Sequence, residues 1–248
     1  MSDQWIFFPC QMGEHTASIF FDHGIHDSIN TVAPRQLLKV RVTFKQPRPD
    51  GMPSNDEFQH LTSLEDGLQA AVQERESIYV GRVTTGGHRH FYIYTSESGE
   101  VWSSRLEALG ASHGYPLAFA LKADESHAGY WQELYPTDDD WQVIKDLRVI
   151  EALGKEGDDG TASRCIDHWA FFTSLPSAEQ FSQWAQERGY NSPATDIADD
   201  GRFRVRFSHD GSVRLPDITS HTIALRRRAS ELGGDYDGWE TPVCKTSA

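Results

Sequence analysis

The chain has 248 residues, of which 38% are hydrophobic and 11% aromatic, and this composition suits a packed globular protein of one or two domains. Its 37 acidic and 23 basic residues give a net charge of −14, which argues against direct nucleic-acid binding and favours solubility or a basic partner. The apolar runs are too short to span a bilayer, no signal-peptide pattern is seen, and the three cysteines are widely spaced, so we expect a cytoplasmic protein with free thiols and no membrane contact.

The first part of the chain is expected to form strands around one long helix. Residues 5–10 and 16–22 are short apolar runs, and residues 37–45 alternate between apolar and polar side chains, a period of two that is typical of a half-buried strand. Residues 54–75 place apolar side chains at spacings of three and four, which predicts an amphipathic helix. The glycine pair at 86–87 separates two further strand-like segments and predicts a hairpin.

Two later segments repeat one order of elements. Residues 88–153 predict a strand ending in Tyr-Thr-Ser, a helix closed by Gly110, a strand and a second helix. Residues 166–240 predict a strand ending in Phe-Thr-Ser, a helix capped by Ser177, a strand with a hairpin and a helix that starts at Asp217. The repeat indicates two copies of one unit, each a sheet with helices on one face.

The fold class that follows is α+β, with two domains built from antiparallel sheets and helices on one face. We place the N-terminal domain at residues 1–155, including a ferredoxin-like half at about 88–153, and a ferredoxin-like C-terminal domain at residues 165–242. The boundary is placed in residues 154–164, which are rich in Gly, Asp and Ser and are typical of a linker.

The C-terminal unit allows a more detailed prediction. A turn is expected at residues 210–211, followed by a second short strand. Arg204 and Arg206 should share the strand face opposite their apolar neighbours, because side chains alternate along a strand. The residues expected in the core are Phe171, Phe181, Trp184 and Leu225.

No catalytic or cofactor-binding motif is found, so the sequence predicts no catalytic residue, no cofactor and no metal. His88 and His90 share one strand face and are the residues that a metal would use, but no third ligand can be identified. Residues 22–27 hold two histidines in a segment that resembles a loop. Cys165 and His168 are three apart on a strand and should point to opposite faces, which argues against a nucleophilic pair.

Six arginines form a local basic surface in the C-terminal part of this acidic chain. They are Arg202, Arg204, Arg206, Arg226, Arg227 and Arg228. Two interpretations are open: the surface could hold an anion, or it could contact acidic side chains of the other domain. We favour the second.

Residues 167–240 resemble the regulator of ribonuclease E activity B. The resemblance rests on "DHWAFFTS", on "ERGY" at the end of a helix and above all on the closing "GGDYDGWE". The N-terminal part, with "DGMPSNDEF" and "YWQELYPTDDDW", is similar to domain of unknown function family 695. The resemblance implies a small, acidic, non-enzymatic protein that binds ribonuclease E and lowers its activity; the long N-terminal domain is a departure from the stand-alone regulator.

The segment "GGDYDGWET" at residues 233–241 has two interpretations. Gly233 and Gly234 could end a helix, after which the chain turns back and its aromatic side chains pack against the sheet. The same residues could instead contact a partner, since Tyr and Trp are typical of interfaces. The candidate partner-binding residues are Asp235, Tyr236, Asp237, Trp239 and Glu240.

Two functions are therefore carried forward. The first is an acidic cytoplasmic regulatory or adaptor protein, not an enzyme, whose partner is another protein such as a ribonuclease. The alternative is a protein or enzyme that binds a small molecule or metal at a site between the two domains, which the His pair and the repeat suggest. Neither the oligomeric state nor the identity of the partner follows from the sequence.

Overall fold

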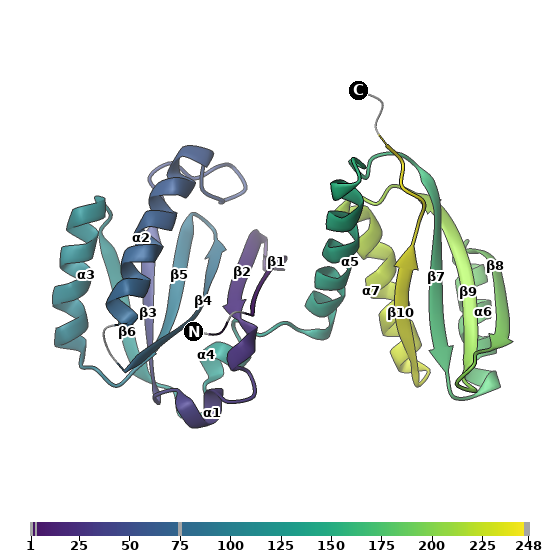
Figure 1. Cartoon of the computed structure of the whole chain (residues 1–248), viewed down its shortest axis with the longest axis horizontal. Coiled ribbons are helices and arrows are strands. Elements are labelled where there is room, and N and C mark those ends of the chain that lie inside the picture. Colours follow the sequence, from purple (N-terminus) through teal and green to yellow (C-terminus); the bar gives the residue numbers. More distant parts are fainter. Residues whose placement is uncertain (1, 3, 74–75, 246–248) are drawn as a thin grey trace. The chain divides into compact units, whose positions relative to one another are not determined.

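A computed structural model describes residues 2, 4–73 and 76–245, and the chain divides into two compact units, Met1–Pro136 and Thr137–Ala248 (Figure 1). Each unit contains its own antiparallel sheet with helices packed against it, so the α+β class predicted from the sequence is confirmed. Within the described ranges, no helix is both long enough and apolar enough to cross a membrane.

The first unit is built on a six-stranded antiparallel sheet in the order β1-β2-β4-β5-β3-β6. Its strands are β1 (Trp5–Met12), β2 (His15–Asp22), β3 (Gln36–Thr43), β4 (Ser77–Thr85), β5 (His88–Thr95) and β6 (Leu117–Ala123). Its helices are the 3-10 turn η1 (His23–Ile25), α1 (Ile29–Val32), α2 (Asn55–Gln73), α3 (Gly99–His113) and α4 (Ala128–Trp131). The predicted strands are all present, whereas η1, α1 and α4 are too short to leave a periodic pattern.

Alternation along β3 decides which face of this sheet the two long helices cover. Leu38, Val40 and Val42 are fully buried and belong to one apolar cluster with Leu64 of α2 and Trp102 of α3. Burying side chains of this size contributes about 1.5–3 kcal/mol each. Gly86 and Gly87 have φ of +56° and +80° in the β4–β5 turn, the backbone that a two-residue hairpin of type I′ requires.

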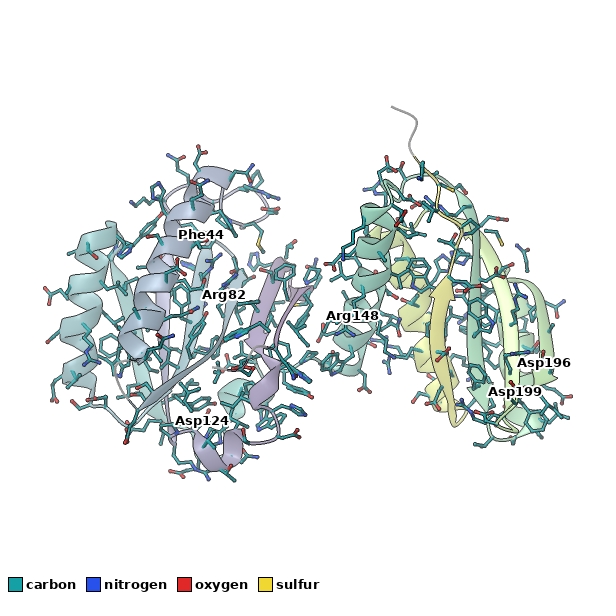
Figure 2. All side chains as sticks on the ribbon, viewed as in Figure 1. Phe44, Arg82, Asp124, Arg148, Asp196 and Asp199 are labelled. Atoms are coloured by element: carbon teal, nitrogen blue, oxygen red, sulfur yellow. The ribbon has the colours of Figure 1, made fainter. Side chains whose placement is uncertain are left out.

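Asp124, labelled in Figure 2, fixes the segment that follows β6. Its carboxylate accepts a hydrogen bond from the Tyr94 hydroxyl at 2.8 Å and from the backbone amides of Ala128 and Gly129 at 2.8 and 2.9 Å. These three bonds satisfy a buried carboxylate and tie the start of α4 to β5.

The second unit holds a four-stranded antiparallel sheet in the order β10-β7-β9-β8. Its elements are α5 (Asp138–Lys155), β7 (Arg164–Phe172), α6 (Leu175–Glu187), β8 (Asn191–Ile197), β9 (Phe203–Gly211), α7 (Leu215–Glu231) and β10 (Gly234–Glu240). The connection β7-α6-β8-β9-α7-β10 with this strand order is the one expected of a ferredoxin-like unit. Helices α6 and α7 pack on one face of the sheet, and α5 packs on α7.

Four residues were expected in the core of the second unit, and one of these predictions is wrong. Phe181 and Leu225 are fully buried, and Trp184 packs against them as a partly buried side chain. The prediction that Phe171 lies in the core is wrong. The side chains of β7 alternate between the two faces of the sheet, and Phe172 is the one in the core. Phe171 lies on the opposite face, where the Arg202 guanidinium sits 4.6 Å from its ring centre.

The boundary between the units also differs from the one read from composition. It lies between Pro136 and Thr137, so α5 belongs to the second unit, and the glycine-rich residues 154–164 connect α5 to β7 inside that unit. The segment 88–153 consequently does not form a ferredoxin-like half, because β5 and β6 are part of the six-stranded sheet. Helix α5 belongs to the second unit because its buried face packs on α7. The linker-like composition of residues 154–164 marks only a loop.

Several helix ends differ from the prediction. Helix α3 continues through Gly110, and it is Gly114, with φ of +69°, that ends it in a left-handed conformation. The α6 cap is Ser174, whose hydroxyl accepts from the Ser177 amide at 3.3 Å. Helix α7 begins at Leu215, before the expected start, because a proline follows at a position that suits the first helical turn.

The strands on either side of residues 198–202 differ from the prediction. Residues 210–211 end β9 instead of forming a hairpin turn, and no strand follows them before α7 in this described stretch. Strand β8 was not expected, because its sequence "NSPATDI" is polar and contains a proline, which edge strands tolerate. The predicted end of α2, residues 74–75, lies outside the described residues.

Candidate functional site

The tail motif "GGDYDGWE" turns back after α7, as the sequence suggested, and forms an edge strand that packs along this helix. Gly233, with φ of +70°, lets the chain leave α7, as predicted. Gly234 then begins β10, and a Cβ at this position would lie 2.2 Å from Phe172, so the close approach to β7 requires glycine. From there β10 pairs antiparallel with β7 as far as Glu240.

A β-bulge sets the orientation of the tail side chains. The register with β7 shifts between Tyr236 and Gly238, and Gly238 has φ of +147°. Because one extra residue is inserted, Tyr236 and Trp239 both point into the unit, although they are three positions apart. Their exposed fractions are 5% and 6%. Glycine at 238 corresponds to this bulge and not to the sharp reversal expected from the sequence.

Tyr236 is held by a chain of histidines, of which His168 and His209 are buried. Its hydroxyl lies 2.8 Å from His168 Nδ1, and His168 Nε2 lies 2.8 Å from His209 Nδ1. The His209 ring stacks on His221 with 3.9 Å between ring centres, and His221 Nδ1 lies 2.8 Å from the Tyr190 hydroxyl. The network therefore connects β10, β7, β9 and α7.

Burial keeps these rings neutral. Loss of solvation lowers the pKa of His168 far below its ordinary value, and the neighbouring His209 and His221 lower it further. For the same reason the pKa of His209 falls to about 4, with Asp210 opposing the shift. Burial also raises the pKa of Tyr236, so its hydroxyl remains protonated. A neutral, hydrogen-bonded network of this kind positions the strand.

Trp239 is held by a buried carboxylate on α5. Its indole Nε1 donates to Asp146 Oδ1 at 2.9 Å, Gln142 Nε2 donates to the same oxygen at 2.9 Å, and the Thr222 hydroxyl donates to Oδ2 at 2.5 Å. Burial raises the pKa of Asp146, and the three hydrogen bonds oppose that shift. The last strand is thereby tied to both α5 and α7.

Replacing Asp146 tests this arrangement. Asp146→Ala leaves three buried donors without an acceptor and is expected to destabilise the second unit by about 3–5 kcal/mol. Asp146→Asn keeps the oxygen that binds Trp239 and Gln142 and can donate to the Thr222 hydroxyl, so its cost should stay below about 1.5 kcal/mol. Urea unfolding measures both, and equal losses in the two variants would contradict the network.

The acidic side chains of β10 point the other way. Asp235, Asp237 and Glu240 are all exposed, and Asp235 lies 3.8 Å from the Arg202 guanidinium. Of the five candidate partner-binding residues, the structure thus separates two buried aromatic side chains from three exposed carboxylates. The aromatics hold the strand, and the carboxylates lie on its exposed side.

The arginine surface is paired with carboxylates of its own unit. Arg226 Nη2 donates to Asp139 Oδ1 at 2.5 Å, and Arg227 bonds the same carboxylate. On the outer face of the sheet, Arg204 Nη2 donates to Asp196 at 2.7 Å. Asp139 lies on α5, so the predicted contact with acidic groups is present, but it lies within the second unit and not between domains.

The metal candidates lie in the first unit. The rings of His88 and His90 are 6.3 Å apart on β5, and His88 Nδ1 lies 3.1 Å from Thr43 Oγ1. Burial and the charges of Lys39 and other cations lower the pKa of His90. In the described part of the chain, no group of three or more His, Cys, Asp or Glu side chains is placed to hold a metal ion.

Two other sequence candidates are placed as follows. His23 and His26 stack with 4.5 Å between ring centres in η1 and the residue after it. Cys165 is exposed and His168 is buried, so they lie on opposite faces of β7, as expected.

Sequence reasoning missed the polar residues that hold the tail. Gln142, Asp146 and Leu153 lie four and seven residues apart, on one face of α5, so an acid in phase with apolar positions was the available signal. His168 alternates in phase with the buried residues of β7 and could have been found in the same way. Thr222 carries no such signal, because a buried threonine on a helix is ordinary.

Two family models match the chain, one in each unit. Residues 3–135 match a family of unknown function (DUF695), and residues 144–241 match the regulator of ribonuclease activity B. Both resemblances drawn from the sequence are confirmed in this order along the chain. No curated protein matches.

Two solved structures are similar at a low level. One is provisionally described as a glycine cleavage system transcriptional repressor, with 11% identity over 84% of this chain and 98% of that chain and a TM-score of 0.26. The other is an unknown protein from Galdieria sulphuraria, with 12% identity over 84% and 99% of the two chains and a TM-score of 0.23. Scores this low carry no argument about fold or function.

Proposed function

We propose that this chain, which belongs to the family of unknown function DUF695 through residues 3–135, regulates a ribonuclease by binding it through its C-terminal unit. The match of residues 144–241 to the regulator of ribonuclease activity B supports this at the level of the family. The partner we propose is a ribonuclease E-type enzyme, and the site of action is the cytoplasm, where free cysteines such as Cys165 stay reduced.

The observation that carries the proposal is the row of exposed carboxylates on β10. Asp235, Asp237 and Glu240 lie within seven residues on an edge strand whose orientation is fixed by Tyr236 and Trp239. A strand at the edge of a sheet has backbone groups on one side that no neighbouring strand of that sheet uses. Rigid acidic groups beside such a backbone suit a partner segment that is basic.

We propose no catalytic role for the second unit. The histidines that the structure brings together, such as His168 and His209, are buried and bond to each other and to Tyr236. Their hydrogen-bonding capacity is used to hold β10, which supports binding as the function.

Binding to the purified ribonuclease E-type enzyme of the same organism, measured by isothermal titration calorimetry, tests the proposal. The variant carrying Asp235→Asn, Asp237→Asn and Glu240→Gln should bind roughly tenfold or more weakly, a loss of about 1.4 kcal/mol or more. The matched control carries Glu151→Gln, Glu179→Gln and Asp199→Asn, which removes the same charge from exposed acids outside β10.

Salt should weaken the interaction of the unmodified chain, because exposed ion pairs are screened over about 10 Å at 0.1 M. A chain that does not bind the enzyme contradicts the proposed partner. If the two triple variants lose affinity equally, net charge and not β10 makes the contact.

A further inference from the structure

A polar cavity of about 270 Å³ lies in the second unit where β10 begins. Helix α5 lines it with Asp138, Trp141, Gln142 and Lys145, α7 with Arg226, and β10 with Asp235. All of these residues lie after Pro136, so the cavity belongs to one compact unit. The network that holds Trp239 reaches this cavity through Gln142.

Gln142, one of the residues that line the cavity, has an unused acceptor. The side chain is only 1% exposed, and its amide nitrogen donates to Asp146, which fixes the direction of the amide group. The oxygen Oε1 has no hydrogen-bond partner among the described residues. A buried polar atom left without a partner destabilises the fold, so its retention calls for an explanation such as a bound group.

Arg226, which also lines the cavity, has an unused donor. Its terminal nitrogens bind Asp139 at 2.5 Å and approach Asp138 at 3.6 Å. The remaining Nε–H is buried and has no partner in the part of the chain that the structure describes. The cavity wall therefore carries both an acceptor and a donor that the fold leaves unsatisfied.

The charges around the cavity are balanced. Asp138 and Asp235 contribute two negative charges, and Lys145 and Arg226 two positive charges. A ligand with a net charge would be repelled by one pair, whereas a molecule that carries one group of each sign meets a complement for both. The volume of about 270 Å³ lies just below the range of small-molecule sites, which begins at about 300 Å³, and suits a ligand of amino-acid size.

We propose that this cavity binds a small zwitterion of the amino-acid class. Its ammonium group donates to Gln142 Oε1, and its carboxylate accepts from Arg226 Nε–H. This site goes beyond the proposed ribonuclease regulation and does not depend on it: the two share Asp235, but the evidence specific to this site is the pair of unsatisfied groups on α5 and α7.

The test uses the ¹⁵N-labelled full chain and the indole resonance of Trp141, assigned with Trp141→Phe. The standard L-amino acids are each titrated to about 20 mM, a limit that detects dissociation constants up to about that concentration. At least one should shift the resonance saturably. Its amide derivative, which lacks the carboxylate, and its N-acetyl derivative, which lacks the ammonium, should each bind roughly tenfold or more weakly.

Three variants locate the site. Gln142→Leu removes the acceptor and Arg226→Lys keeps the charge without the Nε–H, and each should reduce affinity by roughly tenfold or more. Gln180→Leu, at an exposed position on α6, should change nothing. If Gln142→Leu does not fold, Arg226→Lys alone decides. Failure of every amino acid to bind, or binding that survives Arg226→Lys unchanged, overturns the proposal and leaves the ribonuclease proposal standing.

Discussion

A chain that ends at Leu232 should lose the cooperative unfolding of its second unit. The truncation removes β10 from the sheet and uncovers the side of β7 that it pairs with. Losing a buried aromatic costs about 3–5 kcal/mol, and both Tyr236 and Trp239 are lost. His168 and Asp146 also lose a hydrogen-bond partner each, at about 1–3 kcal/mol. These losses approach the whole stability of a domain, about 5–15 kcal/mol.

The control for this truncation ends at Lys245. It keeps β10 and the bond from the Cys244 amide to Asp158 at 2.8 Å. Thermal unfolding followed by circular dichroism should show both transitions in the control and only that of the first unit in the chain ending at Leu232. If the second transition stays at its original temperature, the buried aromatics do not hold the unit, and a contact role for the tail becomes the better interpretation.

Acid should destabilise the second unit well before its carboxylates are fully protonated. The fold keeps His168 and His209 neutral, whereas an unfolded histidine gains a proton below about pH 6.5. Their contribution to stability is therefore complete above pH 6.5 and is lost as the pH falls towards 4, the approximate pKa of folded His209. For His209 alone the loss by pH 4 is on the order of 3 kcal/mol.

Asp146 acts in the opposite direction, because its raised pKa adds stability as the pH falls. The variant His209→Gln separates the two effects, since it keeps a hydrogen-bonding side chain without a titrating ring. Urea unfolding between pH 7 and 4, followed by the amide resonances of β7 and β9, should show a shallower loss in this variant. A loss as steep as that of the unmodified chain would mean that His209 is not the group that titrates.

The period of the apolar pattern gave the regular elements correctly. Leu38, Val40 and Val42 alternate on β3, and the spacing of three and four along α2 marks its buried face. Glycine and capping residues predicted the ends of helices less reliably. A glycine such as Gly110 can lie inside a helix when a neighbouring turn approaches it closely. Edge strand β8 lacks an apolar pattern altogether, because pairing with β9 and not burial forms it.

The tail shows why the candidate site could be found only in part. Its composition of glycines and aspartates is typical of a turn, and the inserted residue of the bulge hides the alternation of Tyr236 and Trp239. The partners of these side chains, His168 and Asp146, are far away in sequence and meet them only in the folded unit. The boundary at Pro136 was missed for the same reason, since α5 joins its unit through tertiary packing on α7.

The rate at which the ribonuclease E-type enzyme of the same organism cleaves a defined RNA, measured with increasing amounts of this protein, tests the central claim most directly. The unmodified chain should change the rate saturably. The chain with Asp235→Asn, Asp237→Asn and Glu240→Gln should need roughly tenfold more protein for the same effect, while the control with Glu151→Gln, Glu179→Gln and Asp199→Asn behaves like the original. A cleavage rate that does not respond to the unmodified chain would contradict regulation of this ribonuclease.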